Sequence, residues 1–154
     1  MKHIAYLAVA AAGVAVLAGC DKPNPGATVW SGTHSAHAQA TCWSFDINQG
    51  IDLQSCAQQL LNNRENGNTA PEVPVVPGNV IGISVDPAVA EDGWTIRFGG
   101  QPIVQEPITS TYFRFTMPDF QPIPAEGVGL EVVSQGETNL PRGLWVYRIV
   151  PGAS

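Results

Sequence analysis

The sequence predicts a mainly β protein: an immunoglobulin-like antiparallel sandwich with one short helix, which follows an N-terminal signal peptide. Three observations lead to this prediction. The chain opens with an apolar leader, most of the remainder divides into short β-type segments bounded by Gly and Pro, and a single run has helical periodicity. Short strands with a turn about every ten residues are typical of a sandwich. A small barrel is the alternative, because strand spacing does not reveal how the sheet edges are closed.

The leader occupies residues 1–19. Lys2 and His3 form a short positive end, and residues 4–18 are an almost uninterrupted apolar run. This arrangement is typical of a signal peptide, and the run is shorter than the roughly 20 apolar residues of a membrane-spanning helix. Residues 17–20, Leu-Ala-Gly-Cys, fit a lipobox, in which the thiol of Cys20 accepts a diacylglyceryl group. We therefore expect a mature lipoprotein, held at the outer face of the bacterial cell membrane by palmitate-type chains on Cys20.

The mature chain has room for one domain. Residues 20–27 contain Pro and Gly without an apolar period and predict a lipidated tether, and residues 28–154 predict a single β-sandwich domain. Without residues 1–19 the chain carries six basic and thirteen acidic side chains, a net charge of −7 with neutral histidines. This charge argues against a nucleic-acid partner, because binding phosphates requires a cluster of Lys and Arg.

Two cysteines remain once Cys20 is acylated. Cys42 and Cys56 are an even pair in an exported chain, so we predict a disulfide that closes a loop of about 15 residues. Two buried free thiols or a redox pair are the alternatives. A redox pair normally has a C-x-x-C spacing, which this pair lacks.

The first half of the domain predicts a hairpin and the helix. Residues 28–31 and 36–45 alternate small or apolar residues with polar ones on either side of Gly32 and Thr33. Asp52 is a suitable N-cap for a helix that ends near Asn66 and Gly67. The apolar side of this helix would consist of Leu53, Cys56, Ala57, Leu60 and Leu61.

The second half predicts a succession of strands. Residues 64–78 read as a surface loop with at most an edge strand at 72–76. Gly99 and Gly100 predict a turn between two paired strands. The predicted strands cover residues 80–85, 94–98, 103–109, 112–116, 128–134 and 144–150. Both cysteines precede Trp94, whereas those of a true immunoglobulin domain flank the core tryptophan, so the prediction is limited to an immunoglobulin-like sandwich.

Several short pieces of the mature sequence resemble a known family. They are Cys20-Asp21-Lys22-Pro23, Ala27-Thr28-Val29, Ala40-Thr41-Cys42, Leu53-Gln54-Ser55-Cys56, the stretch 85–94, Gly100-Gln101-Pro102 and Gly143-Leu144-Trp145. Together they resemble small secreted actinobacterial lipoproteins that are grouped as a domain of unknown function. The resemblance spans most of the mature chain, and the Pro-rich stretch 71–77 departs from the family pattern. It implies an anchored β-sandwich with a paired-cysteine segment and brings no catalytic residues.

Candidate catalytic and metal-binding groups are few. No serine lies in a G-x-S-x-G elbow, and no histidine follows the N-terminal third of the chain to act as a base. His34 and His37, with Asp46 or Cys42 beyond them, could be imagined as a copper or zinc site. Residues three apart in a strand point to opposite faces, however, so we favour two solvated histidines and predict no metal ligand.

The carboxylates and tryptophans have competing interpretations. Glu91 and Asp92 could serve a calcium loop or a glycosidase cleft, but the segment 90–93 is typical of a polar loop that caps a strand. We expect Trp94 and Trp145, which lie in alternating strands, to belong to the core. The sequence leaves open whether Trp30 and Trp43 are core residues or part of a sugar-binding stripe.

These patterns favour a protein that binds and does not catalyse. We predict no enzyme, no catalytic residues and no cofactor, but a membrane-anchored binding or scaffolding module for an envelope protein or ligand. The candidate contact loops are residues 71–77 and 118–127. The alternative is an envelope metal carrier or an enzyme whose site the sequence does not reveal.

Overall fold

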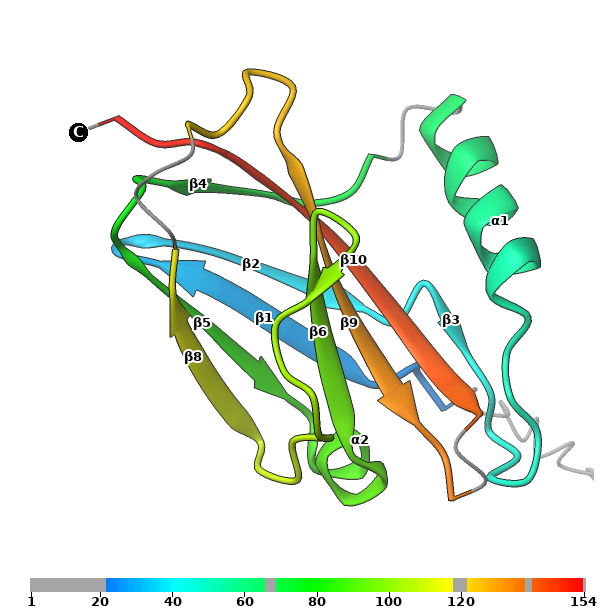
Figure 1. The fold of residues 1–154 in the computed structure, drawn as a ribbon. Coiled ribbons are helices and arrows are strands. Elements are labelled where there is room, and N and C mark those ends of the chain that lie inside the picture. Colours follow the sequence, from blue (N-terminus) through cyan, green and yellow to red (C-terminus); the bar gives the residue numbers. More distant parts are fainter. Residues whose placement is uncertain (1–21, 66–68, 118–121, 138–139, 154) are drawn as a thin grey trace, which may run out of the picture.

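The computed structural model describes residues 22–65, 69–117, 122–137 and 140–153. Two sheets face each other in a sandwich, as the sequence predicts, and the helix α1 stands beside them (Figure 1). The four-stranded sheet has the order β2 (His34–Gln39), β1 (Gly26–Ser31), β5 (Val80–Val85) and β8 (Tyr112–Thr116). The six-stranded sheet has the order β3 (Cys42–Trp43), β10 (Pro141–Pro151), β9 (Val128–Gln135), β6 (Trp94–Phe98) and β7 (Gln101–Pro102), and β4 (Glu72–Val75) pairs in parallel with β10.

The core lies between the two sheets because alternate residues of each strand point inward. β9 and β10 show this alternation most clearly, since buried and partly exposed residues follow each other along both strands. Trp94 and Trp145 are fully buried, so both predictions of a core tryptophan are confirmed. The ring of Trp94 meets the edge of Phe113 from the opposite sheet at 6.5 Å between centroids.

The predicted strand 36–45 is in fact divided between the two sheets. β2 ends at Gln39, and β3 begins at Cys42 in the other sheet. Two consecutive residues make the crossing, because Ala40 donates to the carbonyl of Pro25 (2.9 Å) while Thr41 donates to that of Leu144 (2.8 Å). Sequence alternation continues through this step and therefore does not reveal it.

The predicted strand 103–109 is wrong. After the turn at Gly99 and Gly100 only Gln101–Pro102 pairs with β6, and a single further bridge joins Ile108 to Trp94. Pro107 lies within the predicted strand and contributes to the difference, since proline has no N–H to donate to a sheet.

The predicted polar loop at 90–93 is also wrong, because a short helix, α2 (Pro87–Asp92), covers most of it. Pro87 occupies the first turn, where its missing N–H costs nothing. Val89 and Ala90 are buried, and Gly93, with a φ of +81°, ends the helix. The exposed Glu91 and the inward-facing Asp92 therefore have different surroundings although they are neighbours in the sequence.

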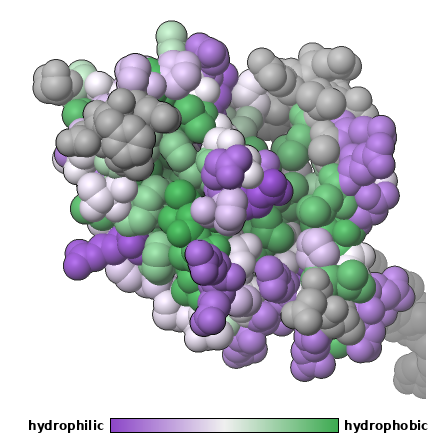
Figure 2. Space-filling view, in the orientation of Figure 1, coloured by the Kyte–Doolittle hydropathy of each residue, from purple (hydrophilic) through white to green (hydrophobic). Residues whose placement is uncertain are grey.

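The predicted helix is confirmed as α1 (Leu53–Glu65). The carboxylate of Asp52 caps it, accepting hydrogen bonds from the backbone N–H of Gln54 (2.9 Å) and from the hydroxyl of Ser55 (2.9 Å). Three residues of the predicted apolar side have a described exposure: Cys56 is enclosed, Leu60 is half-buried and Leu53 is 39% exposed. The side chains of Ala57 and Leu61 are outside the described part of the structure. The part of the outer helix surface that is coloured in the space-filling view is largely hydrophilic (Figure 2).

Candidate functional site

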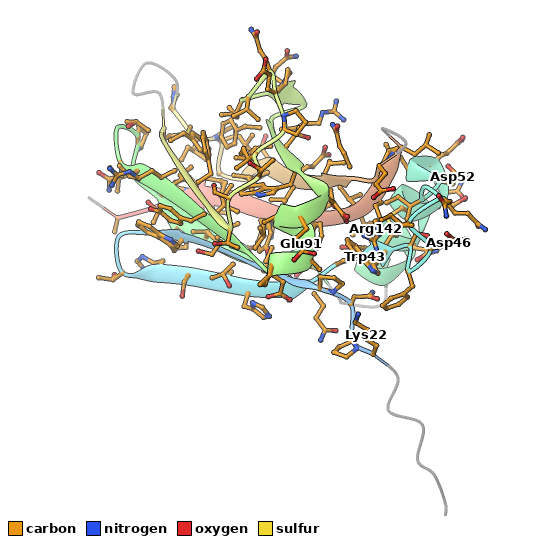
Figure 3. The ribbon with its side chains drawn as sticks, turned by 90° about the horizontal axis from the view of Figure 1, so that it is seen from below. Lys22, Trp43, Asp46, Asp52, Glu91 and Arg142 are labelled. Atoms are coloured by element: carbon orange, nitrogen blue, oxygen red, sulfur yellow. A yellow bond between two sulfur atoms is a disulfide. The ribbon has the colours of Figure 1, made fainter. Side chains whose placement is uncertain are left out.

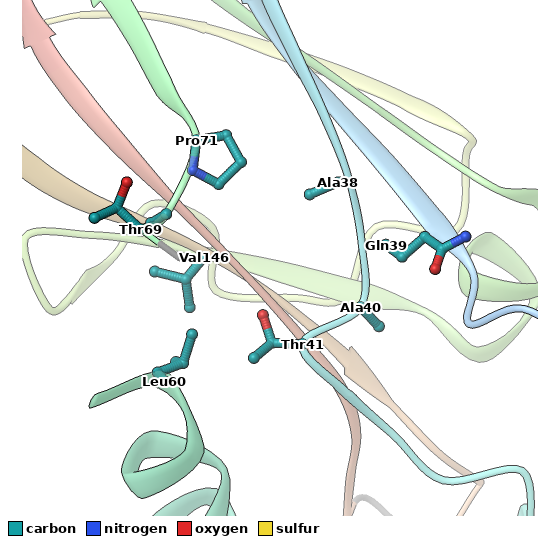
Figure 4. Close-up of a pocket in the computed structure, with 9 residues that line it drawn as sticks. Ala38, Gln39, Ala40, Thr41, Leu60, Thr69, Pro71 and Val146 are labelled. Carbon is teal, nitrogen blue, oxygen red and sulfur yellow. The ribbon is translucent and has the colours of Figure 1, made fainter. Parts of the chain in front are cut away.

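A hollow of about 380 Å³ lies between α1 and the sandwich (Figure 4). We call it the helix-side groove. It is bounded by the end of β2, the crossing segment 40–41, the segment that leads into β4, one residue of β10 and one residue of α1. Its lining residues are Ala38, Gln39, Ala40, Thr41, Leu60, Thr69, Ala70, Pro71 and Val146. The volume is at the lower end of the range of about 300–1,000 Å³ that is usual for ligand sites.

The groove follows a gap in the pairing of β10. β3 pairs with Gly143 and Leu144, and β4 pairs with the stretch that begins at Arg148. Between them, residues 145–147 pair only with β9 on the other side. Among the described residues, the six-stranded sheet therefore has an open interval of three residues on this edge of its longest strand.

Val146 is at the centre of this interval. The carbonyl of Leu144 accepts from Thr41 (2.8 Å), and the N–H of Arg148 donates to the carbonyl of Pro71 (2.8 Å). Backbone groups of alternate residues point to the same side of a strand, so the N–H and C=O of Val146 also point to this edge. Within the described ranges, neither group has a hydrogen-bond partner at the edge, and both face the groove.

The described residues that line the groove carry no charge. Five of the nine lining side chains are apolar alanine, leucine or valine, and the remainder are Gln39, two threonines and Pro71. None of these side chains titrates in the physiological range. The groove thus offers one backbone donor and acceptor pair, two hydroxyls and small apolar surfaces, but no acid, base or strong nucleophile.

A second hollow of about 360 Å³ lies on the other side of Thr41. It surrounds the predicted disulfide between Cys42 and Cys56, which is confirmed, with 6.0 Å between the two Cα atoms. Asp52 lies on its rim, and the hydrogen bonds from Ser55 and Gln54 lower the pKa of its carboxyl below the ordinary value. Because these bonds cap α1, we assign Asp52 a structural role.

Three side chains from distant parts of the chain meet at the end of the domain where the chain exits at Lys22 (Figure 3). The guanidinium of Arg142 contacts the carboxylate of Asp92 at 2.6 Å and lies 4.5 Å from the ring centre of Trp43. Its Nε donates to the carbonyl of Ser44 (3.0 Å). Since both charged side chains are almost fully enclosed and paired with each other, this cluster does not present a free charge to a ligand.

The two histidines do not converge. His37 lies against Thr28, with 3.0 Å between Nδ1 and Oγ1, whereas His34 is exposed at the rim of a smaller hollow of about 240 Å³ where β2 begins. Within the described ranges, no three His, Cys, Asp or Glu side chains are arranged to hold a metal ion.

Trp30 lies on the outer face of the four-stranded sheet, opposite Gly82 on β5. A side chain at Gly82 would collide with the indole, so this glycine makes room for the ring. Tyr112 is nearly parallel to Trp30, with 6.4 Å between ring centres. Trp43, the other tryptophan left open by the sequence, packs on Trp145 at 5.9 Å and under Arg142.

The predicted contact loop 71–77 is largely a structural element. β4 lies within it, and Val73 and Val75 are fully buried against the core. Of the predicted loop 118–127, residues 118–121 are outside the described residues, and Ile123 is buried. The first loop is therefore unsuitable as a free contact surface, because removing it would open the core.

Cys20 is also outside the described residues. No helix within the described ranges has both the length and the apolar character needed to cross a membrane. The amino-acid sequence does not indicate the helix-side groove, because the presence of a valine in a strand does not reveal whether its backbone groups are hydrogen-bonded.

Comparison with protein families, characterised proteins and solved structures finds no match to this chain. The candidate site therefore rests on its own geometry.

Proposed function

We propose that this protein is a lipid-anchored component of the bacterial cell envelope, which binds a partner at the helix-side groove without catalysing a reaction on it. The single observation that supports binding is the open backbone pair of Val146 at the floor of a groove with uncharged walls. A catalytic site needs an acid, a base or a nucleophile beside the substrate, and the groove walls supply none of them.

The anchor proposal rests on the lipobox at Cys20 and agrees with the resemblance to small actinobacterial lipoproteins. The length of the tether follows from where the chain first contacts the domain. Asn24 donates to the carbonyl of Ala40 (3.1 Å), and Gly26 already belongs to β1. The tether is thus shorter than residues 20–27. Three residues separate Cys20 from Asn24, and a chain extends by at most about 3.5 Å per residue, so the acylated domain would lie close to the membrane surface.

Site-specific photo-crosslinking in intact cells tests the binding proposal. The crosslinker is placed at Thr69, an exposed residue on the groove, and at Thr116, an exposed residue of β8 on the other sheet as a matched control. We expect a discrete adduct from Thr69 and none of the same mass from Thr116. Equal labelling from both positions, or none from Thr69, would count against the groove as the binding site.

Metabolic labelling with a radioactive fatty acid tests the anchor proposal. Cys20→Ala removes the only thiol that the lipobox offers, so we expect the label to disappear and the unprocessed precursor to accumulate. A Cys20→Ala protein that still carries the label would show that the anchor assignment is wrong.

A further inference from the structure

We infer that the helix-side groove binds an extended peptide segment, one residue of which pairs through its backbone with Val146. This inference rests on the proposed function, because it names the class of partner for the same groove. The inference rests on the open interval of β10, which exposes a backbone donor and acceptor where the strand has no neighbour among the described residues.

The geometry of the open pair selects the partner. The N–H and C=O of Val146 point to one side, and a residue in an extended chain presents its own N–H and C=O in the complementary arrangement. Addition of a strand to an open sheet edge is a general mode of peptide recognition, in which main-chain hydrogen bonds supply the affinity. An isolated anion or cation would satisfy only one of the two groups of Val146.

The neighbouring bonds limit the length of the contact. The carbonyl of Leu144 already accepts a hydrogen bond from the N–H of Thr41, and the N–H of Arg148 already donates one to the carbonyl of Pro71. The interval between Leu144 and Arg148 spans about 13 Å along an extended strand. The partner can therefore form one residue pair at Val146, and its flanking residues must leave the groove on either side.

The walls indicate the chemistry of the peptide. The side chains around Val146 are small or uncharged, among them Ala38, Ala40 and Ala70, and Leu60 of α1 closes the outer side. A charged side chain would lose its hydration here without gaining an opposite charge. We therefore expect a neutral segment with small apolar residues at its centre.

The test uses the full chain in detergent and a capped pentapeptide, acetyl-Thr-Ala-Val-Ala-Thr-amide. Binding is followed by calorimetry and by hydrogen exchange of the Val146 amide. We expect saturable binding that slows exchange at Val146, because its N–H becomes bonded. The same peptide N-methylated at its valine lacks one donor, and we expect its affinity to fall about fivefold to tenfold.

A backbone substitution provides the reciprocal test. Val146→Pro removes only an N–H that is not bonded to β9, so the strand pairing is retained, and we expect the affinity to fall by a similar factor. Val146→Thr changes the side chain but keeps the N–H, and its affinity should stay within about twofold of the parent. The N-methylated peptide keeps the inference testable if the proline variant does not fold.

The outcomes separate this inference from the proposed function. Equal binding of the two peptides, or an unchanged exchange rate at Val146, overturns the backbone pairing. If the Thr69 crosslink nevertheless persists, the groove binds a partner of another kind and the proposed function stands. Loss of the Thr69-specific crosslink overturns the proposed function, whatever the pentapeptide does.

Discussion

Two segments are attached to the sandwich in opposite ways. The first segment, residues 24–31, includes β1, which lies between β2 and β5 in the four-stranded sheet. The second, α1, lies beside the six-stranded sheet. α1 supplies Leu60 to the helix-side groove, and the N-terminal segment pairs with β2, whose end lines the groove. The two segments differ in what holds them.

The N-terminal segment is held by buried, non-covalent contacts from the opposite sheet. The indole of Trp145 donates to the carbonyl of Pro25 (3.0 Å), and the hydroxyl of Tyr147 donates to that of Ala27 (2.6 Å). Ala27 and Val29 add buried apolar surface. This segment cannot leave without opening the core.

The helix is held mainly by a covalent bond. Of the α1 side chains whose exposure the structure describes, only Cys56 is buried, and its sulfur is bonded to Cys42. The remaining support is the cap at Asp52 and the half-buried Leu60. The two sides of the groove therefore differ in stability. The sandwich side is part of the cooperative fold, whereas the helix side can open locally.

The largest expected effect comes from the first segment. Trp145→Ala removes a fully buried indole and its hydrogen bond to Pro25, and we expect a loss of about 3–5 kcal/mol in the free energy of unfolding. Urea titration followed by fluorescence measures it. Thr116→Ala, at an exposed position, is the control and should change the value by less than about 0.5 kcal/mol. If Trp145→Ala also changed the free energy of unfolding by less than about 0.5 kcal/mol, the contacts of Trp145 with the N-terminal segment would not stabilise the fold.

Removing the disulfide should affect the other segment. With a loop of about 15 residues, the chain-entropy argument gives a loss of about 3 kcal/mol for the Cys42→Ala, Cys56→Ala double variant. In this double variant, we expect hydrogen exchange to accelerate in α1 while the amides of β9 and β10 keep their protection. Uniform acceleration through both sheets would mean that α1 is part of the cooperative core after all.

Tyr147→Phe tests a single bond of the first segment. The variant keeps the buried ring but removes the donor to Ala27, so we expect a loss of about 1–2 kcal/mol in the free energy of unfolding. Burial also raises the pKa of the Tyr147 phenol, and spectroscopic titration should therefore leave this tyrosine protonated above the ordinary pKa of a phenol. An unchanged unfolding midpoint in urea would show that the bond contributes nothing to attachment.

The smallest effect is expected at the cap of α1. Hydrogen bonds lower the pKa of Asp52 from 3.8, so its contribution is present above that pH and is lost as the pH falls through the lowered value. We expect Asp52→Ala to reduce the helical circular dichroism at pH 7 and to abolish this acid-dependent change. Asp52→Asn keeps a capping side chain without a charge, and it should retain the helix but lose the pH dependence. A pH profile of α1 that is identical in all three proteins would contradict the cap.

Local patterns in the sequence were sufficient for part of this structure. Asp52 followed by apolar residues at helical spacing predicted α1, and an even pair of cysteines after residue 20 predicted the disulfide. Alternation predicted that Trp94 and Trp145 are buried. Each of these features depends on residues close together in the chain or on a property of the side chain itself, so the sequence displays it directly.

The candidate site could not be predicted in the same way. Whether the backbone of Val146 is paired depends on where β3 ends and β4 begins, and these strands lie far from it in the sequence. The Arg142–Asp92 contact likewise joins residues 50 positions apart. The wrong strand at 103–109 shows the same limit, since its apolar residues favoured a strand although Pro107 lacks a backbone donor and only Ile108 forms a bridge, to Trp94.

The sequence by itself thus determined the elements whose causes are local: most of the strands, the capped helix and the burial of Trp94 and Trp145. The tertiary structure alone decided which sheet each strand joins and that the chain changes sheets between Ala40 and Thr41. It also decided that β10 has an interval around Val146 with no partner on one edge among the described residues. The physical reason is that periodicity reports which side of a strand is buried, whereas a backbone hydrogen bond depends on a partner that can come from anywhere in the chain.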